Sequence, residues 1–111
     1  MASTFKNFVK KNVGTANTTV YQPTAAGIQS TIIGLTLCNT TNAPIEASVM
    51  MYHHSTTNTV FVVKEAIVPV GSTIVPVGGE QKLVITANDA VLIYSNTASS
   101  VDAVLSVLEI T

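Results

Sequence analysis

The side chains of this sequence best suited to chemistry are two adjacent histidines, His53 and His54, and one cysteine, Cys38. Imidazole nitrogens and thiolates bind zinc and related metals, so a metal site is the first possibility to consider. On a β-strand, however, adjacent side chains point to opposite faces, and no cysteine or carboxylate lies close to the histidines in sequence. We therefore expect no bound metal. The simpler interpretation places one histidine at the mouth of a loop or at a subunit interface.

Nucleophilic catalysis would require Cys38 or a serine beside a base and an orienting acid. Cys38 and a histidine could meet if their strands are neighbours, yet no glycine-rich elbow or oxyanion signature accompanies either of them. The carboxylates are isolated in sequence, although folding could still bring two of them together as an acid–base pair. They are Glu46, Glu65, Glu80, Asp89, Asp102 and Glu109. The sequence predicts a buried thiol, no enzyme activity and no cofactor.

Charge and composition argue against several classes of partner. The net charge is −1, and the chain has no arginine or tryptophan to stack on bases, so no direct contact with nucleic acid is expected. The pair Gly78-Gly79 lacks the lysine and threonine of a phosphate-binding loop and is better explained as a bend over 78–81. No apolar segment suits a signal peptide or a membrane span, so no membrane contact is predicted.

The shortage of charged residues is the most informative feature of the composition. They make up 10% of the chain, whereas about 25% is usual in soluble domains. Threonine, serine and asparagine take their place. Because a lone monomer normally keeps a more charged surface for solubility, much of the exterior is expected to face other protein.

These residues must be positioned by strands, and the segment 31–54 shows the clearest strand pattern. Residues 31–38 and 45–52 are rich in β-branched residues and alternate between apolar and polar types. A turn rich in asparagine and ending in proline separates them at 39–44. The pattern predicts a hairpin of two antiparallel strands, with Ile33, Leu35 and Leu37 on the core face of the first.

Further strands are expected at 18–22, 60–66, 73–77, 82–86, 90–95 and 101–111, separated by turn signals. About seven to nine short strands without a convincing helix indicate an all-β fold, either an antiparallel β-sandwich or a jelly roll. Residues 17–111 would form this single domain. The segment 101–111 is partly apolar on both faces, so we expect it to be a central strand or to be covered by a partner.

Residues 1–16 are expected to form an extended N-terminal arm or an edge strand. Three lysines make this segment basic, whereas the remainder has two lysines and six carboxylates, 2 − 6 = −4. The segment is either a solvated terminus or an arm that docks on an acidic neighbouring subunit. We expect that deleting residues 1–13 leaves the sandwich folded but weakens incorporation into particles. The candidate interface residues are Phe5, Phe8, Val9, Lys10, Lys11 and Val13.

Several phrases of the sequence, in this order, resemble small virion structural proteins of tailed bacteriophages. They are VYQP at 20–23, TIIGL at 31–35, VPVGS at 68–72, VGGEQKLV at 77–84 and VLSVLEI at 104–110. These are turn and strand phrases, not catalytic signatures. Glu80 stands where such chains often have aspartate, and Asn88-Asp89 replaces a glycine-aspartate turn.

The resemblance implies a non-enzymatic β-sandwich that is present in many copies per virion, most simply as a capsid decoration (cement) protein. The alternatives are a neck or tail structural protein, such as a fibre or adaptor component, and a module that recognises host glycan. The implied partners are further copies of the chain and other virion proteins such as the major capsid protein. A homotrimer or larger ring is expected because a C-terminal strand that is apolar on both faces is unfavourable in a monomer. The position in the particle is left open.

Overall fold

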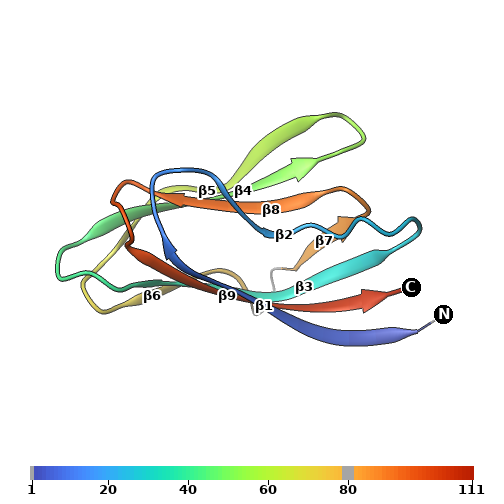
Figure 1. Cartoon of the computed structure of the whole chain (residues 1–111), viewed down its shortest axis with the longest axis horizontal. Coiled ribbons are helices and arrows are strands. Elements are labelled where there is room, and N and C mark those ends of the chain that lie inside the picture. The colour runs from blue at the N-terminus through green and yellow to red at the C-terminus, as the bar shows by residue number, and fades with distance from the viewer. Residues whose placement is uncertain (1, 79–81) are drawn as a thin grey trace.

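Nine β-strands and no helix make up the described part of the chain, arranged as two antiparallel sheets that face each other (Figure 1). The computed structural model describes residues 2–78 and 82–111. Most of the bend expected at 78–81 therefore lies outside the described residues. The all-β sandwich expected from the sequence is confirmed, with a strand number at the upper end of the predicted range.

The first sheet, sheet A, runs in the order β1, β9, β3 and β6, with a short fifth strand, β7, also beside β3. β6 pairs with residues 35–38 of β3, and β7 pairs with residues 29–32. β9 pairs with β1 on one side and with β3 on the other, so it is the central strand that its apolar pattern predicted. The bounds are β1 (Ser3–Val13), β9 (Val101–Ile110), β3 (Gln29–Asn39), β6 (Thr73–Val77) and β7 (Leu83–Thr86).

The second sheet, sheet B, runs in the order β2, β8, β4 and β5. Its strands are β2 (Thr18–Tyr21), β8 (Ala90–Ser95), β4 (Ile45–His53) and β5 (Asn58–Val68). The chain changes sheet at nearly every connection, and the only pair of consecutive strands that is hydrogen-bonded among the described residues is β4 with β5. Apart from β7, this is the strand order of an eight-stranded jelly roll.

The hydrophobic core lies between the two sheets and is built from alternate residues of the longer strands. Ile45, Ala47 and Val49 on β4 face inward, as their alternation predicted. On β9 the inward residues are all at most 1% exposed: Val101, Ala103, Leu105 and Val107. Side chains from both sheets therefore cover each other's apolar faces.

The hairpin expected at 31–54 is wrong. β3 lies in sheet A and β4 in sheet B, so the two strands face each other across the core and do not pair. The buried Asn39 holds this corner between the sheets: its Nδ2 donates to the carbonyls of Ala43 (2.9 Å) and Val68 (3.0 Å). Alternation shows that a strand has one apolar face, but it does not show which strand lies beside it.

The predicted core face of β3 is correct for Leu35 and Leu37 and wrong for Ile33. A register shift between Ile32 and Gly34 interrupts the pairing of β3 with β9. Because such an irregularity changes which side chains point inward, Ile32 is fully buried and Ile33 is half-buried.

The extended arm expected at the N-terminus is not seen as a separate element. β1 is an edge strand of sheet A and pairs with β9 from Ser3↔Ile110 to Val13↔Val101, with one register shift between Lys10 and Val13. The edge strand was the other interpretation of this segment. The two ends of the chain lie side by side in Figure 1, and Ala2 and Thr111 exchange two backbone hydrogen bonds.

Candidate assembly surface

The structure separates the reactive side chains of the sequence from one another. Cys38 lies at one end of β3, beside the corner that leads to β4, whereas His53 lies at the far end of β4. Eight residues of extended strand span about 26 Å, so a Cys–His pair does not form. The ring of His53 contacts the hydroxyls of Thr56 (2.7 Å) and Ser55 (3.3 Å) in the turn after β4. Within residues 2–78 and 82–111, no group of three metal-binding side chains comes together.

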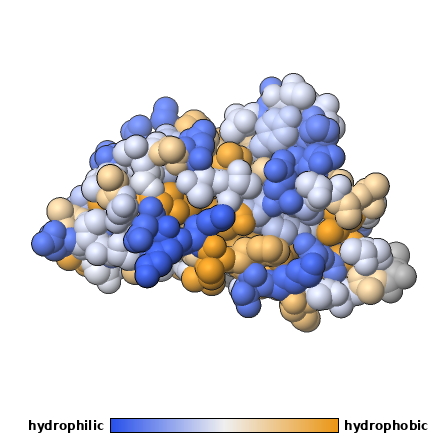
Figure 2. All heavy atoms as spheres, viewed as in Figure 1, coloured by the Kyte–Doolittle hydropathy of each residue, from blue (hydrophilic) through white to orange (hydrophobic). Residues whose placement is uncertain are grey.

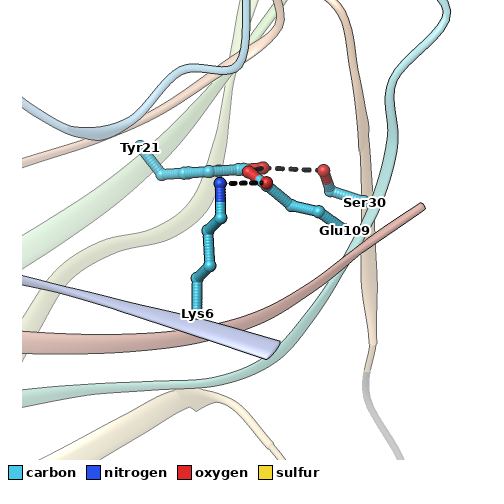
Figure 3. Close-up of polar contacts among 4 residues, drawn as sticks. All are labelled: Lys6, Tyr21, Ser30 and Glu109. Carbon is cyan, nitrogen blue, oxygen red and sulfur yellow. Dashed lines mark hydrogen bonds and ion pairs between the residues drawn. The ribbon is translucent and has the colours of Figure 1, made fainter. Parts of the chain in front are cut away.

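A buried carboxylate, Glu109, is the centre of a polar cluster that joins four strands, shown in Figure 3. Lys6 Nζ lies 2.8 Å from its Oε1, and the Tyr21 hydroxyl donates to its Oε2 at 2.5 Å. The Ser30 hydroxyl lies 2.7 Å from the Tyr21 oxygen, and it donates there because Tyr21 gives its one hydrogen to Glu109. The cluster ties β1, β2, β3 and β9 together at one end of the sandwich.

The pKa values of Glu109 and Tyr21 are shifted by their neighbours. The hydrogen bonds from Lys6 and Tyr21 hold the pKa of Glu109 below its ordinary value, although burial opposes them. Burial, with the hydrogen bond to Glu109, raises the pKa of Tyr21 to about 12. Glu109 therefore stays ionised and Tyr21 stays protonated near neutral pH, which is the arrangement of a structural ion pair.

The sequence contained a signal for this cluster that the expectations above did not use. The inward alternation on β9 extends by one step to Glu109, which is 5% exposed. A carboxylate at the next position of a buried face must find partners within the fold. Its partners could not be named from the sequence, because they come from three other strands.

A second buried carboxylate, Asp89, fixes the turn between β7 and β8. It accepts hydrogen bonds from the backbone nitrogens of His54 (2.8 Å) and Thr86 (3.1 Å) and from the Thr86 hydroxyl (3.0 Å). Burial alone would raise its pKa, but these donors outweigh burial and lower it. The contact with His54 joins this turn to the β4–β5 hairpin. Like Glu109, Asp89 therefore has a structural role, because its hydrogen bonds hold the backbone in place.

The predicted interface residues fall into two groups on β1. Phe5 and Val9 point away from the core and are 75% and 65% exposed. Phe8 is half-buried and packs its ring against Tyr21, with ring centroids 5.0 Å apart, and Val13 is buried in the core. Lys10 and Lys11 are exposed. Of the apolar candidates, Phe5 and Val9 are therefore free to contact a partner.

Phe5 and Val9 belong to a larger apolar surface, the outer face of sheet A. In register across the sheet, Phe5 lies beside Leu108, which lies beside Thr31, which lies beside Val84. A parallel row places Val9 beside Val104 and Val104 beside Thr36. Of the nine large hydrophobic residues that are exposed in the described part of the chain, five lie on this face: Phe5, Val9, Val75, Val84 and Val104.

A shallow depression lies on this face beside Phe5. Its volume is about 250 Å³, and it is lined by Phe5, Lys6, Asn7, Ile33, Ser106 and Val107. Figure 2 views the sandwich from its side, with sheet A below, and hydrophobic residues (orange) reach the surface near the middle of the molecule. An exposed apolar sheet face of this kind is typical of a surface that contacts other protein.

Sheet B exposes a smaller and more charged apolar patch. Phe61 and Ile67 on β5 are both exposed, and they pair in register with Met50 and Glu46 on β4. Lys64 Nζ lies 5.3 Å from the centre of the Phe61 ring, within range of a cation–π contact. The two exposed apolar surfaces therefore lie on different sheets.

The fold defines this chain as a small jelly-roll β-sandwich. No protein-family model and no curated protein sequence matches it. The chain is similar in structure to a protein of Bacillus endospore appendages, which form a novel family of disulfide-linked pili. The TM-score is 0.58 with 15% identity, over 98% of this chain and 88% of that chain. At this identity the similarity is one of fold alone.

A structure of infectious bursal disease virus, Gt strain, aligns with a TM-score of 0.28 and 11% identity, over 97% of this chain and 41% of that chain. A score this low carries no argument about this chain. None of the described segments is a helix long and apolar enough to cross a membrane.

Proposed function

We propose that this chain is a non-enzymatic structural subunit that assembles in many copies outside the cell or in a virion. The observation that carries the proposal is the exposed apolar outer face of sheet A. The composition agrees with it, because charged residues make up only 10% of the sequence. Burying apolar surface drives association, and a contact without ions avoids the cost of desolvating them.

The second apolar patch supports an assembly of more than two copies. A subunit with one self-complementary surface stops at a dimer, whereas a second, different surface allows rings or longer arrays. Phe61 and Ile67 lie on sheet B, away from the outer face of sheet A. This arrangement is compatible with the homotrimer or larger ring that the sequence suggested.

Within this class, a capsid decoration protein of a tailed bacteriophage is the first candidate, because of the strand and turn phrases described above. It would contact further copies of itself and the major capsid protein. A neck or tail component and a glycan-recognition module are the alternatives on the same grounds. In all of these, the chain is a virion protein.

The second candidate is a subunit of a surface appendage. It is favoured by the similarity in fold to the endospore appendage protein, which extends over 98% of this chain. Both candidates use the jelly roll as a building block and differ in what the repeated subunits build.

Immunogold electron microscopy of the source culture tests the proposal and separates the candidates. Antibody against the purified chain should label virion heads for a decoration protein, necks or tails for the alternatives, and filaments for an appendage. Sedimentation velocity of the purified chain should show oligomers. A stable monomer at high micromolar concentration, together with label on no repeated structure, would contradict the proposal.

A further inference from the structure

We propose that the outer face of sheet A binds a second copy of this chain through the same face, with Phe5 of each copy seated in the depression of the other. The inference names the partner for one surface of the proposed assembly, and in that respect it rests on the proposed function. The charge, size and shape of the face support this contact.

The charge of the face suits contact with itself. Between its ends, the outward positions of the described strands carry no charged side chain; Asp102 and Lys11 mark one end, and Lys82 directly precedes β7. Lys6 lines the depression, but its charge is paired with Glu109. In a two-fold contact every residue meets a residue of the same surface, so a charged patch would repel its copy. An uncharged one does not.

The size of the face is sufficient for a stable contact. Four strands at a spacing of about 4.8 Å and ten residues at about 3.3 Å each give roughly 600 Å² per copy. Stable interfaces bury about 600 to 1,000 Å² per partner, so the face alone reaches the lower end of this range. This area is that of a flat plane. The solvent-accessible surface of the side chains is larger, because they project from the sheet.

The shape of the face is self-complementary. It carries both a protruding ring, Phe5, and a depression of about 250 Å³ next to that ring. An apolar cavity of about 150 Å³ holds a benzene ring, so the depression is large enough for a phenylalanine side chain. Ile33 supplies an apolar wall. A projection and a recess on one surface are what a two-fold contact requires, because each copy fills the other.

The edge of sheet A is a poorer surface for the same partner. β1 is the exposed edge strand next to β9, and it carries Lys6, Lys10 and Lys11. Edge lysines oppose pairing between identical strands. Two copies are therefore expected to meet face to face and not edge to edge.

Cross-linking tests this geometry directly. Asn7 lines the depression next to Phe5. If Phe5 of each copy enters the depression of the other, the two-fold axis passes between Phe5 and the depression, and therefore close to Asn7. In a Cys38→Ser background, Asn7→Cys should form a disulfide-linked dimer under mild oxidation. The matched control is Thr19→Cys, an exposed strand residue on β2, at the edge of sheet B opposite to β5 and its Phe61 patch, which should cross-link several-fold less.

Removing the projecting ring is the second arm of the test. Phe5→Lys should reduce the cross-linking of Asn7→Cys at least tenfold and shift the sedimentation of the chain toward smaller species. Phe61→Lys makes the same change at an exposed phenylalanine on the opposite sheet and should leave the cross-linking intact. Both positions are exposed, so circular dichroism should show an unchanged fold.

The inference is overturned if Thr19→Cys cross-links as well as Asn7→Cys, if Phe5→Lys leaves cross-linking unchanged, or if Asn7→Cys does not cross-link. These outcomes are independent of where the protein resides. If the antibody labels neither virions nor filaments, the chain can still dimerise through sheet A. Conversely, a chain that does assemble into such a structure can lack this contact.

Discussion

Glu109 shows how one residue can join several strands. Its carboxylate is almost fully buried and bonds to Lys6 on β1 and Tyr21 on β2, while the Ser30 hydroxyl completes the chain of donors. No described buried side-chain nitrogen or oxygen lacks a hydrogen-bond partner, and this cluster is part of the reason. A buried charge that has its partners is tolerated, whereas a charge that loses one is costly.

Replacing Glu109 with glutamine should destabilise the fold by about 1–3 kcal/mol, because Lys6 loses its counter-ion and Tyr21 a charged acceptor. Urea denaturation at pH 7 measures the change. Glu65→Gln, at an exposed carboxylate on β5, is the control and should change stability by less than about 0.5 kcal/mol. Equal effects of the two substitutions would show that the buried cluster contributes nothing specific.

The free energy of unfolding should fall as the pH drops below about 4, the ordinary pKa of a carboxyl group. Glu109 and Asp89 both have a lowered pKa in the folded protein, so the unfolded chain takes up protons at a higher pH than the folded one. Their contribution is therefore complete above the unfolded pKa and is lost as pH falls through the folded pKa. Urea denaturation at pH 7 and pH 3 measures the loss, which should be smaller in Glu109→Gln than in the wild type.

At the scale of elements, β1 is integrated into the fold on one side and open on the other. It pairs along β9, its Lys6 and Phe8 contact residues of other strands, and its Val13 is buried. Phe5 and Val9 on the same strand are exposed. One strand thus contributes both to stability and to the proposed contact, through alternate residues.

Two phenylalanines three residues apart separate these contributions. Phe8→Ala should cost about 1–3 kcal/mol of stability, because a half-buried ring loses its packing against Tyr21 and the core. Phe5→Ala should cost less than about 0.5 kcal/mol but weaken self-association. Thermal denaturation and sedimentation of the two variants measure this. If Phe5→Ala destabilised the fold more than Phe8→Ala, the side chain of Phe5, and not that of Phe8, would pack against the core.

The pairing of β1 also changes what is expected of a truncation. The sequence alone suggested that removing residues 1–13 leaves the sandwich folded. With β1 in place beside β9, its removal exposes a row of backbone groups on β9 and leaves Glu109 without Lys6. We now expect the truncated chain to unfold at a clearly lower urea concentration than the full chain.

At the scale of the whole molecule, this sequence has a single cysteine, Cys38, which is half-buried on β3. One thiol per chain joins at most two copies, so disulfides cannot build a larger array from this sequence. Cys38→Ser should therefore leave the sedimentation of the assembled chain unchanged, as should a reducing agent added to the wild type. Dissociation under either condition would show that assembly depends on a disulfide.

The local structure was largely predictable from the sequence. The alternation of β4 correctly indicated the inward positions Ile45, Ala47 and Val49, the apolar faces of 101–111 correctly indicated a central strand, and turn residues correctly divided the chain into strands. The turn at 87–89 is an example: Asn88 has a φ of 70°, which asparagine tolerates, and Asp89 caps the turn. Such features depend on residues close together in the chain.

The tertiary structure decided the remainder. It placed β3 and β4 in different sheets, turned Ile33 outward at a register shift, and brought Lys6, Tyr21, Ser30 and Glu109 together from four strands. It also gathered the exposed apolar residues of separate strands on one face of sheet A. Side-chain alternation is set by the backbone of a single strand and can be read locally, whereas strand partners depend on the packing of the whole chain.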